Sequence, residues 1–362
     1  MPSHEGIGQM TRIDWLVFRR VLARVSLTVV LFFALLALVE SLNTTKFRML
    51  SGFGGPLLAV AGIVLSALRS SIGVLPISVL IGTIAGVLDM QARREFTIIQ
   101  ATGHSIWRVA RTPLLFAFII SAAISIGGES LLILGNRLMP GTPINNETSQ
   151  AWMEQTGKDG PYIITADRLT GNPPALSGVT VFLTGSAGRD RIEADAAELK
   201  PGHWLFKSAT RFALDAAPEQ LSDYELATRT TAGDLQLHAS GARDLTLPEL
   251  IRAATSALSD SEYRAVALTS LYRTFAMPVM VAGGMLLGFA VAAGYRRKLQ
   301  YGNTVLFGIV MGFALFTINE MAVRAGNADV LSPVAAALGP GFVSVIVGVT
   351  ALLYSQDGRM WR

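Results

Sequence analysis

The residues best placed to do chemistry in this sequence are ionisable side chains at the ends of apolar stretches. They are Glu40, Arg69, Glu129, Arg273 and Glu320. An ionisable side chain inside a membrane span costs roughly 2.5–3.5 kcal/mol on insertion scales, so it needs a function or a partner. One interpretation is a cavity that handles a charged amphiphile. The alternative is snorkelling to the membrane interface or internal ion pairing.

Two basic residues directly after the first apolar stretch belong to the same candidate cavity. Lys46 and Arg48 are placed to meet anionic lipid headgroups or a phosphorylated substrate. Together with the five residues above, they form the predicted substrate-cavity set.

Common catalytic and metal-binding patterns are missing from the sequence. It has no G-x-x-x-x-G-K-[ST] loop, no G-x-G-x-x-G after a strand and no G-x-S-x-G. The absence of cysteine excludes disulfides, a thiolate nucleophile and a Cys-ligated metal. The histidines share no close spacing; they are His4, His104, His203 and His238. The sequence therefore nominates no enzyme, no metal site and no cofactor bound by this chain.

The composition is that of a membrane protein with a water-soluble insert. Hydrophobic residues make up 51%, charged residues only 15%, and the mean hydropathy is +0.45, whereas soluble proteins carry roughly a quarter charged residues. Residues 135–268 hold 12 basic and 17 acidic residues, and the remainder holds 18 and 9. The positive charge therefore flanks apolar stretches and does not indicate nucleic-acid binding.

Six apolar stretches are long enough to cross a bilayer, which takes about 20 residues. They are Val21–Val39, Ile72–Leu88, Thr112–Gly128, Thr274–Tyr295, Leu299–Asn319 and Val330–Gln356. Glycines spaced four apart predict close helix contacts within them; these pairs are Gly82/Gly86, Gly284/Gly288 and Gly308/Gly312.

The distribution of basic residues predicts the orientation of these spans. With six spans and both termini cytoplasmic, 13 basic residues fall on the inner side and four in the short outer segments, as the positive-inside rule requires. A seventh apolar stretch, Gly52–Leu68, is then expected to lie along the outer interface or to extend the second helix. The predicted domains are residues 1–134 with three spans, an outward-facing insert 135–268, and residues 269–362 with three spans.

The insert reads as an all-β domain followed by a helix. Short stretches of alternating polarity predict strands at 161–164, 179–184, 191–195, 204–206, 224–228 and 235–238. Their spacing favours a sandwich or a partly open barrel, which could hold an apolar ligand or serve as a packed spacer. Leu247-Pro248-Glu249-Leu250 is expected to start a helix over 247–265.

The cytoplasmic loop 89–111 contains a candidate docking helix. Phe96 and Ile99 recur at helical spacing after Arg93, Arg94 and Glu95, and Gly103 is a natural helix stop. A short amphipathic helix in such a loop can lie on the membrane or dock into a groove of a partner.

The motifs in and around this loop resemble a known family. The elements Leu75-Pro76, Leu80-Ile81-Gly82, Arg94-Glu95-Phe96-Thr97 and Gln100-Ala101-Thr102-Gly103 are similar to the "LP…LLG…SEL…ASG" stretch of the lipopolysaccharide export permeases of the LptF/LptG (YjgP/YjgQ) family. Leu247-Pro248-Glu249-Leu250 and the Glu262–Pro278 region extend the similarity, which favours the G-type subunit. Arg94 departs from the family, where a serine-like residue is common, and the first span lacks the lysine that G-type subunits can carry near its outer end.

The resemblance implies an ABC-type exporter subunit of the bacterial inner membrane with a periplasmic jelly-roll domain. The implied machine extracts lipopolysaccharide from the inner membrane and passes it through that domain. Implied partners are an F-type sister permease, a dimeric cytoplasmic ATPase that binds ATP and Mg, and a periplasmic bridge protein; a single-span regulatory subunit is a further candidate. Residues Arg93, Arg94, Glu95, Phe96, Ile99 and Gly103 would then couple the chain to the ATPase. The alternatives are a permease for lipoproteins or another amphiphile, or a membrane-anchored periplasmic scaffold.

Overall fold

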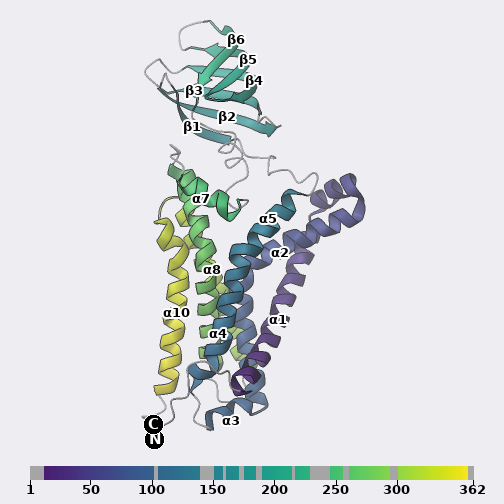
Figure 1. Cartoon of the computed structure of the whole chain (residues 1–362), viewed down its shortest axis with the longest axis vertical. Helices are drawn as coiled ribbons and strands as arrows, with labels where there is room; N and C mark the ends of the chain where they lie inside the picture. The colour runs from purple at the N-terminus through teal and green to yellow at the C-terminus, as the bar shows by residue number, and fades with distance from the viewer. Residues whose placement is uncertain are drawn as a thin grey trace. The chain divides into compact units, whose positions relative to one another are not determined.

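The computed structural model describes residues 12–101, 105–138, 151–157, 160–170, 175–184, 190–213, 217–228, 245–255, 261–293 and 301–357. The chain forms two compact units. The helical unit comprises residues 1–138, 272–326 and 330–362, and the β unit comprises residues 139–271 and 327–329. Each unit is described separately below (Figure 1).

Six helical segments in the described residues are long and apolar enough to cross a membrane, as predicted. The helices of the first half are α1 (Arg12–Ser41), α2 (Thr44–Ala92), α3 (Glu95–Ala101) and α4 (Ile106–Ala123), which continues through a π-helical turn (Ile124–Gly128) into α5 (Glu129–Arg137). Those of the second half are α8 (Ser261–Ala293), α9 (Tyr301–Asn327) and α10 (Pro333–Asp357). The short helix α3 lies across one end of the bundle (Figure 1), which we call the α3 end.

The apolar stretch Gly52–Leu68 belongs mainly to α2, which confirms one of the two predicted alternatives. The helix is broken at Gly54 and Gly55, and Gly55 has φ +76° and ψ −179°. Residues with a side chain rarely adopt this conformation. Beyond the break, residues 54–92 form a span-capable segment of 39 residues, which is about 58 Å at 1.5 Å per residue.

Glycines allow the helices of this unit to approach closely, as their spacing predicted. A Cβ atom on Gly82 would lie 2.6 Å from the Val25 Cα of α1. A Cβ on Gly288 of α8 would lie 2.9 Å from the Leu80 carbonyl oxygen of α2. Most of the α8 span is buried, whereas few residues of the α1 and α9 spans are. Helix α8 is therefore a central element, and α1 and α9 expose apolar side chains.

The β unit contains a six-stranded antiparallel sheet in which each strand pairs with its neighbour in sequence. The strands are β1 (Ala151–Gly157), β2 (Gly160–Thr170), β3 (Ala175–Leu183), β4 (Arg191–Lys200), β5 (His203–Phe212) and β6 (Glu219–Ala227). Five predicted strands fall on β2 to β6 or overlap them; the sixth, 235–238, lies outside the described residues. Strand β1 was not predicted. With six span-capable helices and an inserted β sheet, the predicted fold class is confirmed.

The core of the β unit is filled by large side chains around a buried amide. Trp204, Tyr162 and Phe206 are among its fully buried residues. The Gln155 Oε1 atom accepts hydrogen bonds from Tyr162 Oη (2.7 Å), Thr228 Oγ1 (2.7 Å) and Trp204 Nε1 (3.1 Å). These bonds join β1, β2, β5 and the residue that follows β6. They satisfy polar atoms that would otherwise be costly to bury.

The helix expected over 247–265 is two helices in the structure. Helix α7 (Leu247–Thr255) begins where the sequence indicated. Glu249 Oε2 accepts hydrogen bonds from both the backbone nitrogen and the hydroxyl of Thr246, at 2.7 and 2.8 Å, and this cap fixes the start of the helix. Residues 256–260 lie outside the described residues, and α8 begins at Ser261.

Candidate coupling site and charge network

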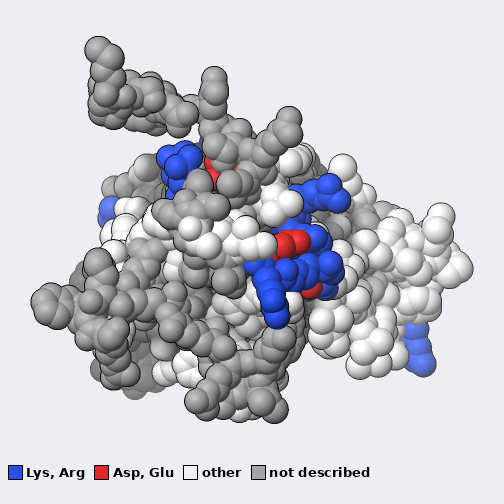
Figure 2. Space-filling model, turned by 90° about the horizontal axis from the view of Figure 1, so that it is seen from below, with Lys and Arg blue, Asp and Glu red and all other residues white. Residues whose placement is uncertain are grey.

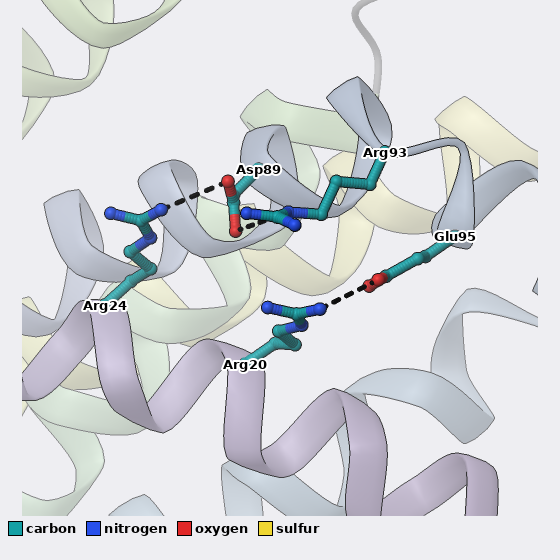
Figure 3. Close-up of polar contacts among 5 residues, drawn as sticks. All are labelled: Arg20, Arg24, Asp89, Arg93 and Glu95. Carbon is teal, nitrogen blue, oxygen red and sulfur yellow. Dashed lines mark hydrogen bonds and ion pairs between the residues drawn. The ribbon is translucent and has the colours of Figure 1, made fainter.

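The first contact of the candidate site joins α1 to α3. Arg20 Nη2 lies 3.0 Å from Glu95 Oε1, and the two side chains are 36% and 24% exposed (Figure 3). The second carboxylate oxygen, Glu95 Oε2, is buried and accepts no hydrogen bond within the described residues. Glu95 is thus held toward its own chain by one charged contact.

A second cluster at the same end joins α1 to α2. Arg24 Nη2 lies 3.1 Å from Asp89 Oδ1, and Arg93 Nε lies 3.6 Å from Asp89 Oδ2 (Figure 3). Asp89 therefore bridges an arginine of α1 and one from the end of α2. Helix α1 thus supplies one arginine to each of the two clusters.

The chain turns from α2 into α3 at Arg94, which has a strained backbone conformation. Arg94 has φ +61°, in the left-handed region that normally favours glycine or asparagine. Its backbone nitrogen donates to the Gln91 carbonyl (3.0 Å), and its carbonyl accepts from the Ile98 nitrogen (3.1 Å). Arg94 therefore ends α2 and begins α3 at once.

Helix α3 has an inward and an outward face, and they differ from the expected ones. Ile99, expected to face a partner, is 6% exposed and packs in the core of the helical unit. Ile98 is 62% exposed instead. The helix and its position are as the sequence indicated, but its exposed apolar residue is the neighbouring isoleucine. The side chain of Phe96 is not described, and Gly103 lies outside the described residues.

The charged side chains on the described surface of the α3 end are mostly basic (Figure 2). Figure 2, viewed from this end, shows lysine and arginine side chains gathered around acidic ones. Besides the ion-paired arginines, the exposed basic residues from this end include Arg19, Arg94, Arg108 and Arg111. The surface can attract an acidic protein surface or anionic headgroups.

The predicted cavity charges at the opposite end of the helical unit are partly paired with one another. Arg273 Nη2 of α8 lies 3.6 Å from Glu320 Oε1 of α9. Glu129 lies within electrostatic reach of both Arg273 and Arg69. Four of the predicted residues thus meet across α2, α5, α8 and α9, and for Arg273 and Glu320 the ion-pair alternative holds.

The other residues of the predicted substrate-cavity set have fewer described contacts with this charge network. Glu40 Oε1 accepts a 3.3 Å hydrogen bond from Ser70 Oγ. Because Ser70 directly follows Arg69 in the sequence, this bond places Glu40 near Arg69. Arg48 is exposed on the first segment of α2, and the Lys46 side chain is not described. The structure therefore brings Glu40 beside the charge network and does not bring Arg48 into it by any described contact.

A small pocket lies among α2, α8, α9 and α10. Its lining includes Gly73, Pro76, Gly284, Gly312 and Asn319. A Cβ on Gly73 would lie 3.6 Å from Arg273 Nη2, so the guanidinium adjoins this pocket. Its lining is mainly apolar, with a few polar groups.

Sequence reasoning missed three charged residues of the α3 end as site residues. Arg20, Arg24 and Asp89 come from segments that looked like helix ends, where charge is usual. The usable signal was the four-residue spacing of Arg20 and Arg24, which puts both on one face of α1.

Comparison with models of protein families assigns the chain to one family. The family model described as "Lipopolysaccharide export system permease LptF/LptG" matches residues 15–354. No individual protein with a curated description matches the chain. The family match covers both sets of spans and the β unit between them, in the order that the structure shows. The chain therefore belongs to the LptF/LptG family of lipopolysaccharide export permeases.

Proposed function

We propose that this chain is the permease subunit of an ABC-type exporter that extracts lipopolysaccharide from the inner membrane and passes it through its periplasmic β unit. Family membership and six span-capable helices make it a multi-pass inner-membrane protein with a periplasmic region. Members of this family are transporter subunits and not enzymes. The observation that carries the proposal is the family match over residues 15–354.

In the proposed complex, the chain pairs with a sister permease, and a separate cytoplasmic ATPase binds ATP and Mg. We assign this chain to the G type and its sister to the F type. The basic residues near the α3 end support a cytoplasmic location for both termini. A periplasmic bridge protein receives the lipid from the β unit, and a single-span regulatory subunit is a further candidate partner.

The α3 end is the proposed coupling site. Nucleotide-driven motion of the ATPase enters through the corner formed by Arg93, Arg94 and Glu95. Arg20 and Arg24 then carry this motion to α1, through their ion pairs with Glu95 (3.0 Å) and Asp89 (3.1 Å). Gly103 and Phe96 keep the roles that the resemblance implies, as the end of the coupling helix and as an apolar contact.

The charge network at the opposite end is proposed to meet the charged part of the lipid. Arg69 and Arg273 carry the positive charge that phosphate groups require, with Lys46 and Arg48 as further candidates. Glu129, Glu320 and Glu40 balance these cations while no lipid is bound. The network therefore avoids unpaired charge in the resting state.

Photocrosslinking in the β unit tests the proposed lipid path. Val181 is buried in the core of the unit, Leu183 packs against that core, and Phe182 between them is 36% exposed. A photocrosslinking amino acid at Val181 should trap lipopolysaccharide only when ATP is hydrolysed, and the matched Phe182 variant should trap little.

Leu183 provides a second position if the fully buried Val181 does not tolerate the larger side chain. Absence of lipid at both positions while transport continues would contradict the path through the β unit. Capture of lipoprotein in place of lipopolysaccharide would favour the alternative substrate.

A further inference from the structure

Two neighbouring helices, α4 and α8, are each interrupted at the level where they touch. The α-helical part of α4 ends at Ala123, and Ile124–Gly128 form a π-helical turn before α5 begins. Helix α8 contains Pro278. Proline has no N–H group, so the Thr274 carbonyl, four residues earlier, lacks its usual helical donor. Interruptions of both kinds cause kinks, and π-helical turns are frequent at functional sites.

A hydrogen bond joins the two interruptions. Ser125 Oγ, in the π-helical turn, donates to the Thr274 carbonyl oxygen at 2.7 Å, and both residues are buried. The hydroxyl from α4 thus takes the place of the N–H group that Pro278 cannot supply. The two interruptions therefore form one joint between α4 and α8.

Other buried hydroxyls of the helical unit bond within their own helix. Ser121, one turn before Ser125, donates to the Phe118 carbonyl at 3.0 Å. Thr83 and Ser344 likewise donate to carbonyls three or four residues earlier. This local bond is a usual one for serine and threonine inside a helix. Ser125 departs from the pattern, because its hydroxyl ties one helix to another.

The π-helical turn also places Glu129 of the charge network. The Glu129 N–H group donates to the Ile124 carbonyl, five residues earlier, and so closes the turn. A buried or half-buried stripe recurs every four residues at Ser121, Ser125, Glu129 and Ile133. Such a stripe drifts by about 40° per step in a helix of 3.6 residues per turn. The wider π-helical turn offsets part of this drift, which keeps Glu129 on the side that carries Ser125.

The opposite charge is equally close to the joint. Arg273 directly precedes Thr274, and Glu129 lies within electrostatic reach of it. Arg273 Nη2 also lies 3.6 Å from Glu320 Oε1, so two carboxylates act on one guanidinium. The hydrogen bond of Ser125 therefore fastens α4 to α8 beside both Glu129 and Arg273.

We infer that Ser125 is a positioning residue for the charge network: its bond to the Thr274 carbonyl fixes Glu129 beside Arg273. The inference rests on the proposed role of this network in lipid binding. A guanidinium that is already oriented binds a phosphate group with a smaller loss of conformational entropy. Loss of the joint should therefore weaken lipid binding, although Ser125 itself does not touch the lipid.

Spin labels test the positioning directly. The complex of this chain, its sister permease and the ATPase is assembled in nanodiscs. Leu131→Cys on α5 and Phe275→Cys on α8 replace exposed residues, and the native chain has no cysteine. Ser125→Ala should broaden the distribution of distances between the two labels. Ser121→Ala is the matched control, because it removes an equally buried hydroxyl of α4 that bonds within its own helix, and it should leave the distribution unchanged.

Lipid affinity is the second readout. The lipopolysaccharide concentration that half-saturates ATP-dependent lipid transfer should rise about fivefold in Ser125→Ala. The maximal rate should change little, and Ser121→Ala should change neither quantity.

A second substitution separates positioning from repair of the helix. Pro278→Ala supplies a backbone N–H group for the Thr274 carbonyl. The double variant Ser125→Ala/Pro278→Ala should recover thermal stability. It should keep the weakened lipid affinity and the broad distribution, because the bond between α4 and α8 is still missing. Recovery of all three would show that Ser125 only repairs α8, and would overturn the inference.

Arg273→Ala distinguishes the inference from the function on which it rests. Weakened affinity in Arg273→Ala with unchanged or tighter affinity in Ser125→Ala would overturn the inference and leave the role of the network intact. Unchanged affinity in Arg273→Ala would remove that role, and the inference with it. An unaltered distance distribution in Ser125→Ala would overturn the inference whatever the affinity.

Discussion

At the scale of residues, the pair formed by Arg20 and Glu95 is the contact with the clearest energetic consequence. The two residues are 75 apart in sequence, and their side chains are partly exposed. Exposed ion pairs contribute little, whereas Glu95 is half-buried and its Oε2 atom has no partner among the described residues. Removing Arg20 leaves that carboxylate with neither of its oxygens paired.

A double-mutant cycle on Arg20→Ala and Glu95→Ala should give a coupling free energy of about 0.5–1 kcal/mol, reduced by the exposure of Arg20. The measurement is thermal unfolding of the chain in detergent. Arg19→Ala is the matched control, because Arg19 is an exposed neighbour of Arg20. Its effect should add to that of Glu95→Ala within about 0.3 kcal/mol. If the effects of Arg20→Ala and Glu95→Ala are also additive, the ion pair does not hold α3 against α1.

Tyr162 predicts an alkaline transition in the β unit. Burial raises the pKa of the Tyr162 phenol to about 12, and this effect outweighs the opposing effect of the neighbouring Thr228 and Trp204 side chains. Because the folded-state pKa exceeds the unfolded one, the stabilisation is complete below pH 10 and is lost as the pH rises from about 10 to about 12. The loss is on the order of 3 kcal/mol.

Tyr162→Phe should be less stable than the unsubstituted chain at pH 8, because Gln155 loses a donor at 2.7 Å. Its stability should change less between pH 10 and 12, since no phenol ionises at that site. The measurement is the unfolding midpoint against pH for both proteins. Parallel curves would mean that Tyr162 is not buried as the structure shows.

At the scale of elements, close contact between α2 and α8 determines the packing of the central helices. Gly288→Ala places a Cβ 2.9 Å from both the Leu80 carbonyl oxygen and the Thr83 Cβ. Overpacking of this kind typically costs about 1–3 kcal/mol. Gly127→Ala is the matched control, because a Cβ there meets nothing within 4 Å. Thermal unfolding should separate the two variants, and equal midpoints would contradict the close contact.

The spans were predictable from sequence because apolar length alone identifies them. The sequence alone did not determine the length of α2, because the polar stretch Arg69-Ser70-Ser71 could end a helix or lie within one. Strand β1 was missed for a different reason. Its buried position 155 holds a glutamine, whose hydrogen bonds with β2 and β5 replace the apolar residue that alternation requires.

The candidate site was only partly predictable from sequence, because part of it depends on contacts between residues far apart in the chain. Periodicity placed a helix after Arg94, but its inward face depends on packing against distant residues. Ile98 and Ile99 are equally apolar, and only the tertiary structure buries one and exposes the other. The ion pair of Arg20 with Glu95 joins separate segments that no local pattern connects.

At the scale of the whole molecule, the charge distribution predicts the orientation of the chain in the membrane. The native chain has no cysteine, so single cysteines report cleanly. Ser208→Cys lies at an exposed position of β5, and Ala101→Cys at an exposed position of α3. In intact spheroplasts an impermeant thiol reagent should label the first and not the second. The reverse pattern would overturn the orientation and the proposed direction of export.

The central claim is that this chain moves lipopolysaccharide when a separate ATPase hydrolyses ATP. It is tested most directly in proteoliposomes that contain this chain, its sister permease, the ATPase and labelled lipopolysaccharide. The measurement is the transfer of labelled lipid to a soluble periplasmic acceptor. We expect transfer that requires ATP and that falls at least about tenfold with Arg94→Asp, which opposes the charge of the coupling corner. Transfer without ATP, or no transfer from a complex that hydrolyses ATP normally, would contradict the account.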